Sequence, residues 1–125
     1  MSTASNNDIS AGSLGLALVG QTTSINSPDQ VNPYGRGIKV FVNISAITAG
    51  SAVVTIQGKD PSGNYYTVLA SASLTATGET VLTVYPGTTA AANSVANDVL
   101  PRQWRVSVAV TTGPVNMNVS ACLIV

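Results

Sequence analysis

Apolar and polar residues alternate along most of the chain after residue 37, and this period of two predicts β-strands. Every second position is apolar over 38–44, 54–56, 104–110 and 115–125. The segment 60–64 (DPSGN) between two such runs has the proline, glycine and aspartate of a tight turn. We therefore expect a hairpin formed by strands 52–58 and 64–70.

Shorter alternating runs at 73–75 and 80–85 add further strands, separated by a turn at Thr77-Gly78. Residues 88–100 mix helix-favouring alanines with turn-favouring asparagine and aspartate, so we expect a loop there with at most one helical turn. The total is seven or eight short strands with regular turns and no sustained helical period. This pattern predicts an all-β fold, an antiparallel β-sandwich, with the jelly roll as one topology that fits.

The first third of the chain lacks this regularity. Residues 1–12 are small and polar, and 21–37 is interrupted by Pro28, Pro33, Gly35 and Gly37. We therefore divide the chain into an extended N-terminal arm and connection at 1–36, with room for a short strand at 14–19, and a β-sandwich domain at 37–125.

The charge composition narrows the possible functions. Only 8% of the residues are charged, and five basic residues balance five acidic ones. A neutral chain without a basic cluster does not favour nucleic-acid binding. The chain has no histidine to act as general base or metal ligand. We expect no enzyme activity, no catalytic, cofactor-binding or metal-binding residues, and no cofactor. The single Cys122 is expected as a buried structural thiol.

No apolar stretch approaches the length of about 20 residues that a membrane-spanning helix needs, so no membrane partner is expected. Apolar segment 14–19 also lacks the preceding basic residues of a secretory signal.

Five residues are candidates for an interface: Tyr34, Arg36, Tyr85, Arg102 and Arg105. Tyrosine and arginine are enriched at protein interfaces, and lysine is depleted there. Arg105 alternates away from Trp104, so it is expected to face outward. Tyr65 and Tyr66 should point to opposite faces of one strand, one into the core and the other outward. An exposed tyrosine could also serve as a sugar-binding platform.

The outward positions of the expected strands are mostly uncharged: Thr55, Gln57, Thr67, Thr83, Ser107, Asn116, Asn118 and Ser120. Uncharged polar surface can be buried without desolvating ions. A free monomer of this size normally has a mixed, charged surface. We therefore expect much of this surface to be buried in an assembly.

Residues 38–125 resemble the small capsid decoration (cement) proteins of tailed bacteriophages. The resemblance is carried by 53–60 (VVTIQGKD) running into 63–69 (GNYYTVL), by 100–108 (LPRQWRVSV) and by the closing strand 116–121 (NMNVSA). It implies a β-sandwich or jelly roll on the outer capsid, often trimeric, that reinforces contacts between capsid subunits and has no catalytic residues. The arm at 1–36 has no counterpart in that group.

The expected function is thus a virion structural protein, made in the host cytoplasm, that decorates and stabilises a phage capsid. The expected partners are the major capsid protein and further copies of the chain in a homotrimer. Two alternatives remain open: a tail, baseplate or head-fibre component, and a carbohydrate-binding β-sandwich module.

Overall fold

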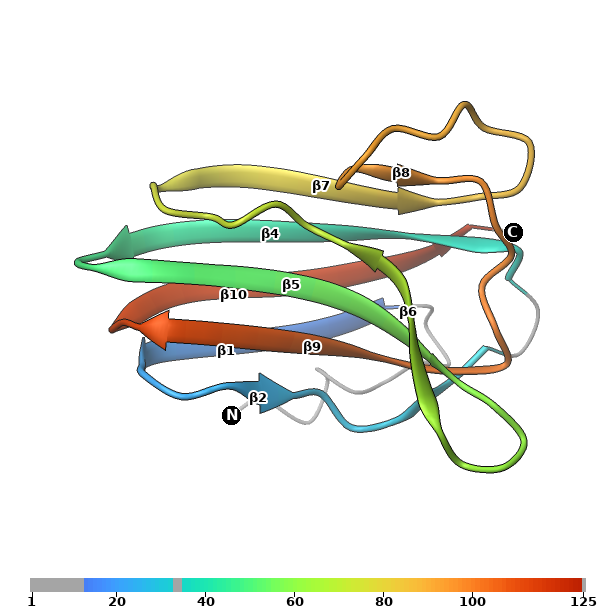
Figure 1. The fold of residues 1–125 in the computed structure, drawn as a ribbon, viewed down its shortest axis with the longest axis horizontal. Helices are drawn as coiled ribbons and strands as arrows, with labels where there is room; N and C mark the ends of the chain where they lie inside the picture. Colours follow the sequence, from blue (N-terminus) through green and yellow to red (C-terminus); the bar gives the residue numbers. More distant parts are fainter. Residues whose placement is uncertain (1–12, 33–34, 125) are drawn as a thin grey trace.

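Two β-sheets pack face to face in the computed structural model, which describes residues 13–32 and 35–124 (Figure 1). Sheet A has the strand order β1 (Ser13–Gln21), β10 (Val115–Ile124), β4 (Gly37–Ile47), β7 (Gly78–Val84), β8 (Val95–Ala96). Sheet B has the order β2 (Ile25–Asn26), β9 (Gln103–Thr112), β5 (Gly50–Lys59), β6 (Tyr65–Ala70), and β3 (Gln30–Val31) also pairs with β9. The described residues include no helix that could cross a membrane.

The pairing of the strands is nested. Strand β1 pairs with β10, β2 with β9, β4 with β7, and β5 with β6, all antiparallel. The chain crosses from one sheet to the other at the β4–β5 and β9–β10 connections, among others (Figure 1). This is the arrangement of a jelly roll, and the predicted antiparallel β-sandwich is confirmed.

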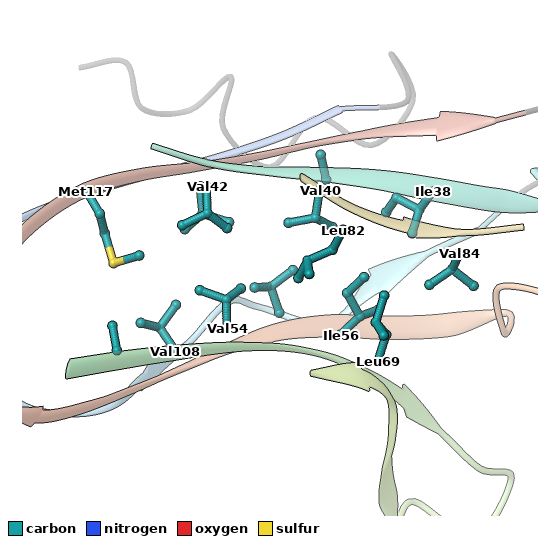
Figure 2. Close-up of a cluster of buried hydrophobic side chains, with 14 of the residues drawn as sticks. Ile38, Val40, Val42, Val54, Ile56, Leu69, Leu82, Val84, Val108 and Met117 are labelled. Carbon is teal, nitrogen blue, oxygen red and sulfur yellow. The ribbon is translucent and has the colours of Figure 1, made fainter. Parts of the chain in front are cut away.

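The core lies between the sheets and follows the period-two pattern. Strand β4 contributes Ile38, Val40, Val42 and Ile44, and all four are buried. They face apolar side chains of sheet B, among them Val54, Ile56, Leu69 and Val108 (Figure 2). The residues that alternate with these core residues point to the outer faces of the sheets. The eight uncharged polar residues expected to face outward, from Thr55 to Ser120, are all at least partly exposed. The hydrophobic effect therefore explains why these strands have the register that they do.

The described part of the segment 1–36 is paired with the two sheets, and the short strand allowed at 14–19 is present as β1. Residues 1–12 and 33–34 lie outside the described residues. Strand β1 runs the length of β10 in sheet A, from Ser13 opposite Cys122 to Gln21 opposite Val115. The following connection lies along β9 and the residue before it. Ser27 N donates to Val106 O at 2.8 Å, and Asn32 N donates to Arg102 O at 2.7 Å. Polar residues here satisfy a sheet edge, which is why their composition resembles that of a solvated linker.

Two further expectations change in detail. The run at 73–75 forms no strand, and Leu74 makes only an isolated bridge to Ala52. The loop expected at 88–100 also contains the two-residue strand β8, which pairs parallel with the end of β7. A single hydrogen-bonded turn precedes β8, in which the backbone N atoms of Ser94 and Val95 donate to Ala91 O. In both places the backbone hydrogen bonds to a neighbouring strand, a long-range effect that local composition does not encode.

Truncating the centre of the core tests this packing. Ile56→Ala is expected to lower the free energy of unfolding by about 2–5 kcal/mol, because it removes a fully buried side chain and leaves a cavity between the sheets. Urea unfolding measures the change. The matched control is Val81→Ala on the outer face of sheet A, where the side chain is 39% exposed and the loss should be small. Equal losses for the two variants would contradict the packing described.

Candidate functional site

Five polar side chains meet on the outer face of sheet B: Asp29, Gln57, Lys59, Tyr65 and Arg105, which we call the Asp29 cluster. Strand register brings four of them together, since Gln57 lies opposite Arg105 and Lys59 lies opposite Tyr65. Residues directly opposite each other on one face of an antiparallel pair are within side-chain reach. Asp29 comes from the connection between β2 and β3 and lies against them.

Asp29 is held by two donors. Lys59 Nζ lies 2.9 Å from Oδ2, and the Tyr65 hydroxyl donates to Oδ1 at 2.6 Å. The hydrogen bond from Tyr65, followed by that from Lys59, lowers the pKa of Asp29 from its ordinary value of 3.8. The same carboxylate raises the pKa of Lys59 through its hydrogen bond. The pair is about one-third exposed, with 27% and 34% of the Lys59 and Asp29 side chains accessible, so solvent screens their attraction.

Arg105 completes the cluster. Its Cζ lies 3.5 Å from the centroid of the Tyr65 ring, and its Nε donates to Gln57 Oε1 at 2.7 Å. A guanidinium stacked on an aromatic ring and fixed by a hydrogen bond has little freedom left to rearrange. The cluster therefore ties the β2–β3 connection, through Asp29, to β5 and β6 of sheet B.

A hollow of about 440 Å³ lies next to the cluster. Its lining residues come from the end of sheet B, where the ribbon of β5 turns into β6 and the chain enters β9 (Figure 1). It is lined by Lys59, Asp60, Pro61, Tyr66, Pro101, Arg102 and Gln103. Lys59 belongs to both the cluster and this lining. The hollow thus combines an aromatic ring and two prolines with charged and amide side chains.

The outer face of sheet A has a different character. Side-by-side rows cross its three central strands: Cys122, Lys39 and Thr83; Ser120, Phe41 and Val81; Asn118, Asn43 and Glu79. Lys39 and Glu79 are the charged residues of these rows, and they lie at opposite ends. The middle row is uncharged, and Val81 is 39% exposed beside the half-buried Phe41.

The predicted candidates lie in different places. Arg105 faces outward as expected and belongs to the Asp29 cluster, and Arg102 is exposed and lines the hollow. The exposed Arg36 and the half-buried Tyr85 belong to neither group. Tyr34 lies outside the described residues.

Three side chains lie elsewhere than the sequence predicts. Cys122 is exposed, so the prediction of a buried thiol is wrong: it does alternate away from Val119, but that parity points to the uncovered outer face. Neither Tyr65 nor Tyr66 is a core residue, since Tyr65 is half-buried and Tyr66 is 46% exposed. Tyr65 points to the outer face of sheet B in the Asp29 cluster, and Tyr66, on the opposite parity, lines the hollow with Pro101.

Sequence reasoning missed Asp29, Gln57 and Lys59 as partners. The hairpin around 60–64 could have placed Lys59 opposite Tyr65, because a turn fixes the register of the strands it joins. Nothing local could have placed Asp29, whose position depends on the path of the connection along β9. Among residues 13–32 and 35–124, no group of three or more acidic or cysteine side chains is placed to hold a metal ion.

The lowered pKa of Asp29 predicts how stability depends on pH. Ionised Asp29 stabilises the folded state fully above 3.8, and this contribution is lost as the pH falls through 3.8 toward the lower folded-state pKa. Asp29→Asn lacks it. The difference in free energy of unfolding between the natural chain and Asp29→Asn, measured with urea, should therefore be larger at neutral pH than at about pH 3.

Asp98→Asn is the matched control, because Asp98 is an exposed carboxylate outside the cluster. Its effect on unfolding should change less between the two pH values. A pH-independent difference for Asp29→Asn would show that the carboxylate is not stabilised by its partners.

Comparison with known proteins adds no relative. No protein-family model matches this sequence, and neither does any curated protein.

Proposed function

We propose that this chain is a non-enzymatic virion structural protein that decorates a phage capsid and stabilises it by burying the outer face of sheet A. The observation that carries the proposal is the middle row of that face, where Phe41 and Val81 lie side by side without a charge. Burying such a surface removes apolar area from water and desolvates few ions.

The capsid as the partner rests on the resemblance of residues 38–125 to capsid decoration proteins. Each bound copy would stabilise the assembled shell by mass action, since it binds the assembled state and not the free subunits. A homotrimer on the outer capsid surface is the proposed arrangement, with the major capsid protein as partner. The absence of histidine from the whole sequence supports a mechanical role.

Mass spectrometry of purified virions tests the location, together with the native mass of the isolated protein. We expect the chain in stoichiometric amount in the particle, a trimer as the native mass of the isolated protein, and density on the outer capsid in an image of the virion. Density in the tail, baseplate or head fibre would replace the capsid role by the corresponding tail or fibre role. A stable monomer absent from virions would overturn the proposal.

A charge placed in the middle row tests the contact face. Phe41→Asp is expected to reduce occupancy on particles at least about tenfold, because a carboxylate would be buried without a partner. Quantitative mass spectrometry of particles incubated with the full-length protein measures occupancy. Thr67→Asp is the matched control, since Thr67 is exposed on β6 in sheet B.

Both substitutions lie on outer faces, so neither should prevent folding, and circular dichroism of the two variants checks this. Equal occupancy of Phe41→Asp and the natural chain would exclude the outer face of sheet A as the contact.

A further inference from the structure

The hollow beside Tyr66 is a second surface that the proposed capsid contact does not use. It lies at the end of sheet B, whereas Phe41 and Val81 lie on the outer face of sheet A. Its volume of about 440 Å³ is within the range of small-molecule sites. Its lining combines apolar walls with a few polar groups, which is the usual composition of a ligand site.

Tyr66 is exposed but held in position. A Cβ atom at Gly58 would lie 2.6 Å from Tyr66 Cζ and 2.6 Å from Pro101 Cγ, so only glycine at 58 allows the ring and the proline to come so close. Gly58 lies opposite Tyr66 in the β5–β6 pair and opposite Trp104 in the β5–β9 pair. The ring of Tyr66 and Pro101 thus form apolar walls that are held against the sheet at Gly58, and Pro61 adds a third apolar group from the turn.

The polar side chains of the hollow differ in how many hydrogen bonds and ion pairs they already make within the chain. Asp60 Oδ1 accepts hydrogen bonds from the backbone N of Ser62 at 2.8 Å and of Asn64 at 2.9 Å, so one carboxylate oxygen is already used by the turn. Lys59 bonds to Asp29. Arg102 is exposed and forms no ion pair with the part of the chain that the structure describes.

Two cations therefore line the hollow against one carboxylate, and the guanidinium of Arg102 is the cation not paired to an acid. A planar guanidinium binds a carboxylate through two parallel hydrogen bonds. The amide of Gln103 and the second oxygen of Asp60 remain as acceptors and donors for hydroxyl groups.

We propose that this hollow binds a pyranose that carries a carboxylate, such as a uronic acid. The apolar C–H face of the sugar ring packs on Tyr66 and the prolines, and its carboxylate pairs with Arg102. Ring hydroxyls of the sugar bond to Gln103 and donate to Asp60. Because Asp60 is negative, it repels the carboxylate of the sugar, which therefore lies on the side of Arg102. A simple carboxylate would use Arg102 alone and leave the apolar walls uncovered, so the combination of groups favours the sugar.

Titration of the ¹⁵N-labelled full chain tests the proposal without requiring any particle. The probes are methyl β-D-glucuronide, the neutral methyl β-D-glucoside, acetate, and N-acetylalanine as a mimic of a peptide carboxyl end. We expect the glucuronide to shift the amide signals of Tyr66, Arg102 and Gln103 in a saturating manner. The other three probes should bind at least about tenfold more weakly.

Variants separate the two parts of the site. Tyr66→Ala should weaken glucuronide binding about tenfold, and Tyr66→Phe should keep it within about twofold because the ring remains. Arg102→Gln should abolish the preference for glucuronide over glucoside. Gly58→Ala should weaken binding by displacing Tyr66 and Pro101. Phe41→Ala and Arg36→Gln are the matched controls, an aromatic residue and an arginine outside the hollow, and both should bind normally.

Several outcomes would overturn the inference. The glucuronide could fail to saturate any signal up to about 30 mM, which is beyond the weakest specific binding expected of such a site. Acetate or N-acetylalanine could match the glucuronide, which would reduce the site to a simple carboxylate contact. Tyr66→Ala could bind as well as Phe41→Ala, which would place the sugar elsewhere.

Discussion

The contact between the inner faces of sheet A and sheet B is the interaction on which the rest of this structure depends. Strand β4 supplies a continuous buried row from Ile38 to Ile44, and β5 and β9 supply its counterpart, including Ile56 and Val108. Because side chains alternate along a strand, this contact also decides what lies outside. A slip of one residue in β4 would bring Lys39 and Asn43 into the core, and a slip in β9 would bring Arg105 and Ser107 there. The composition of the outer faces is therefore fixed by the same pattern that fixes the core.

The central strands could be predicted from the sequence because the alternation of apolar and polar residues within each strand shows which of its faces is buried. Residues 38–44, 54–56 and 104–108 alternate without interruption, and the structure buries the apolar parity of each. Strands β2 and β3 gave no such signal, since they are two residues long and are held by backbone bonds such as Ser27 N to Val106 O. The candidate site was predictable only in part. Alternation placed Arg105 outward, but Asp29 reaches Lys59 through a connection whose path depends on β9. Cys122 is exposed because none of the other elements that the structure describes covers the outer face of sheet A at that position. The sequence of β10 alone does not show whether that face is covered.

The scarcity of charge becomes more informative once the charges are placed in the fold. Five of the ten charged residues lie in the Asp29 cluster or around the hollow: Asp29, Lys59, Asp60, Arg102 and Arg105. The three central rows of sheet A have only Lys39 and Glu79. The two sides of the sandwich therefore present different chemistry to the surroundings. One offers a sheet face with an uncharged middle row between Lys39 and Glu79, and the other offers a small polar and aromatic site.

This segregation makes the two proposals compatible in geometry. In a β-sandwich the outer faces of the two sheets point in opposite directions (Figure 1). A copy whose sheet A lies on a shell turns sheet B, with the Asp29 cluster, toward solution. The Asp29–Lys59 pair then stays in solvent, where an ion pair costs little desolvation, while the buried face contains few charges that would have to be desolvated. The hollow at the end of sheet B remains open to a soluble or surface-bound saccharide in this orientation. The opposite orientation would bury several charged groups of the cluster, and its desolvation cost makes it the less favourable arrangement.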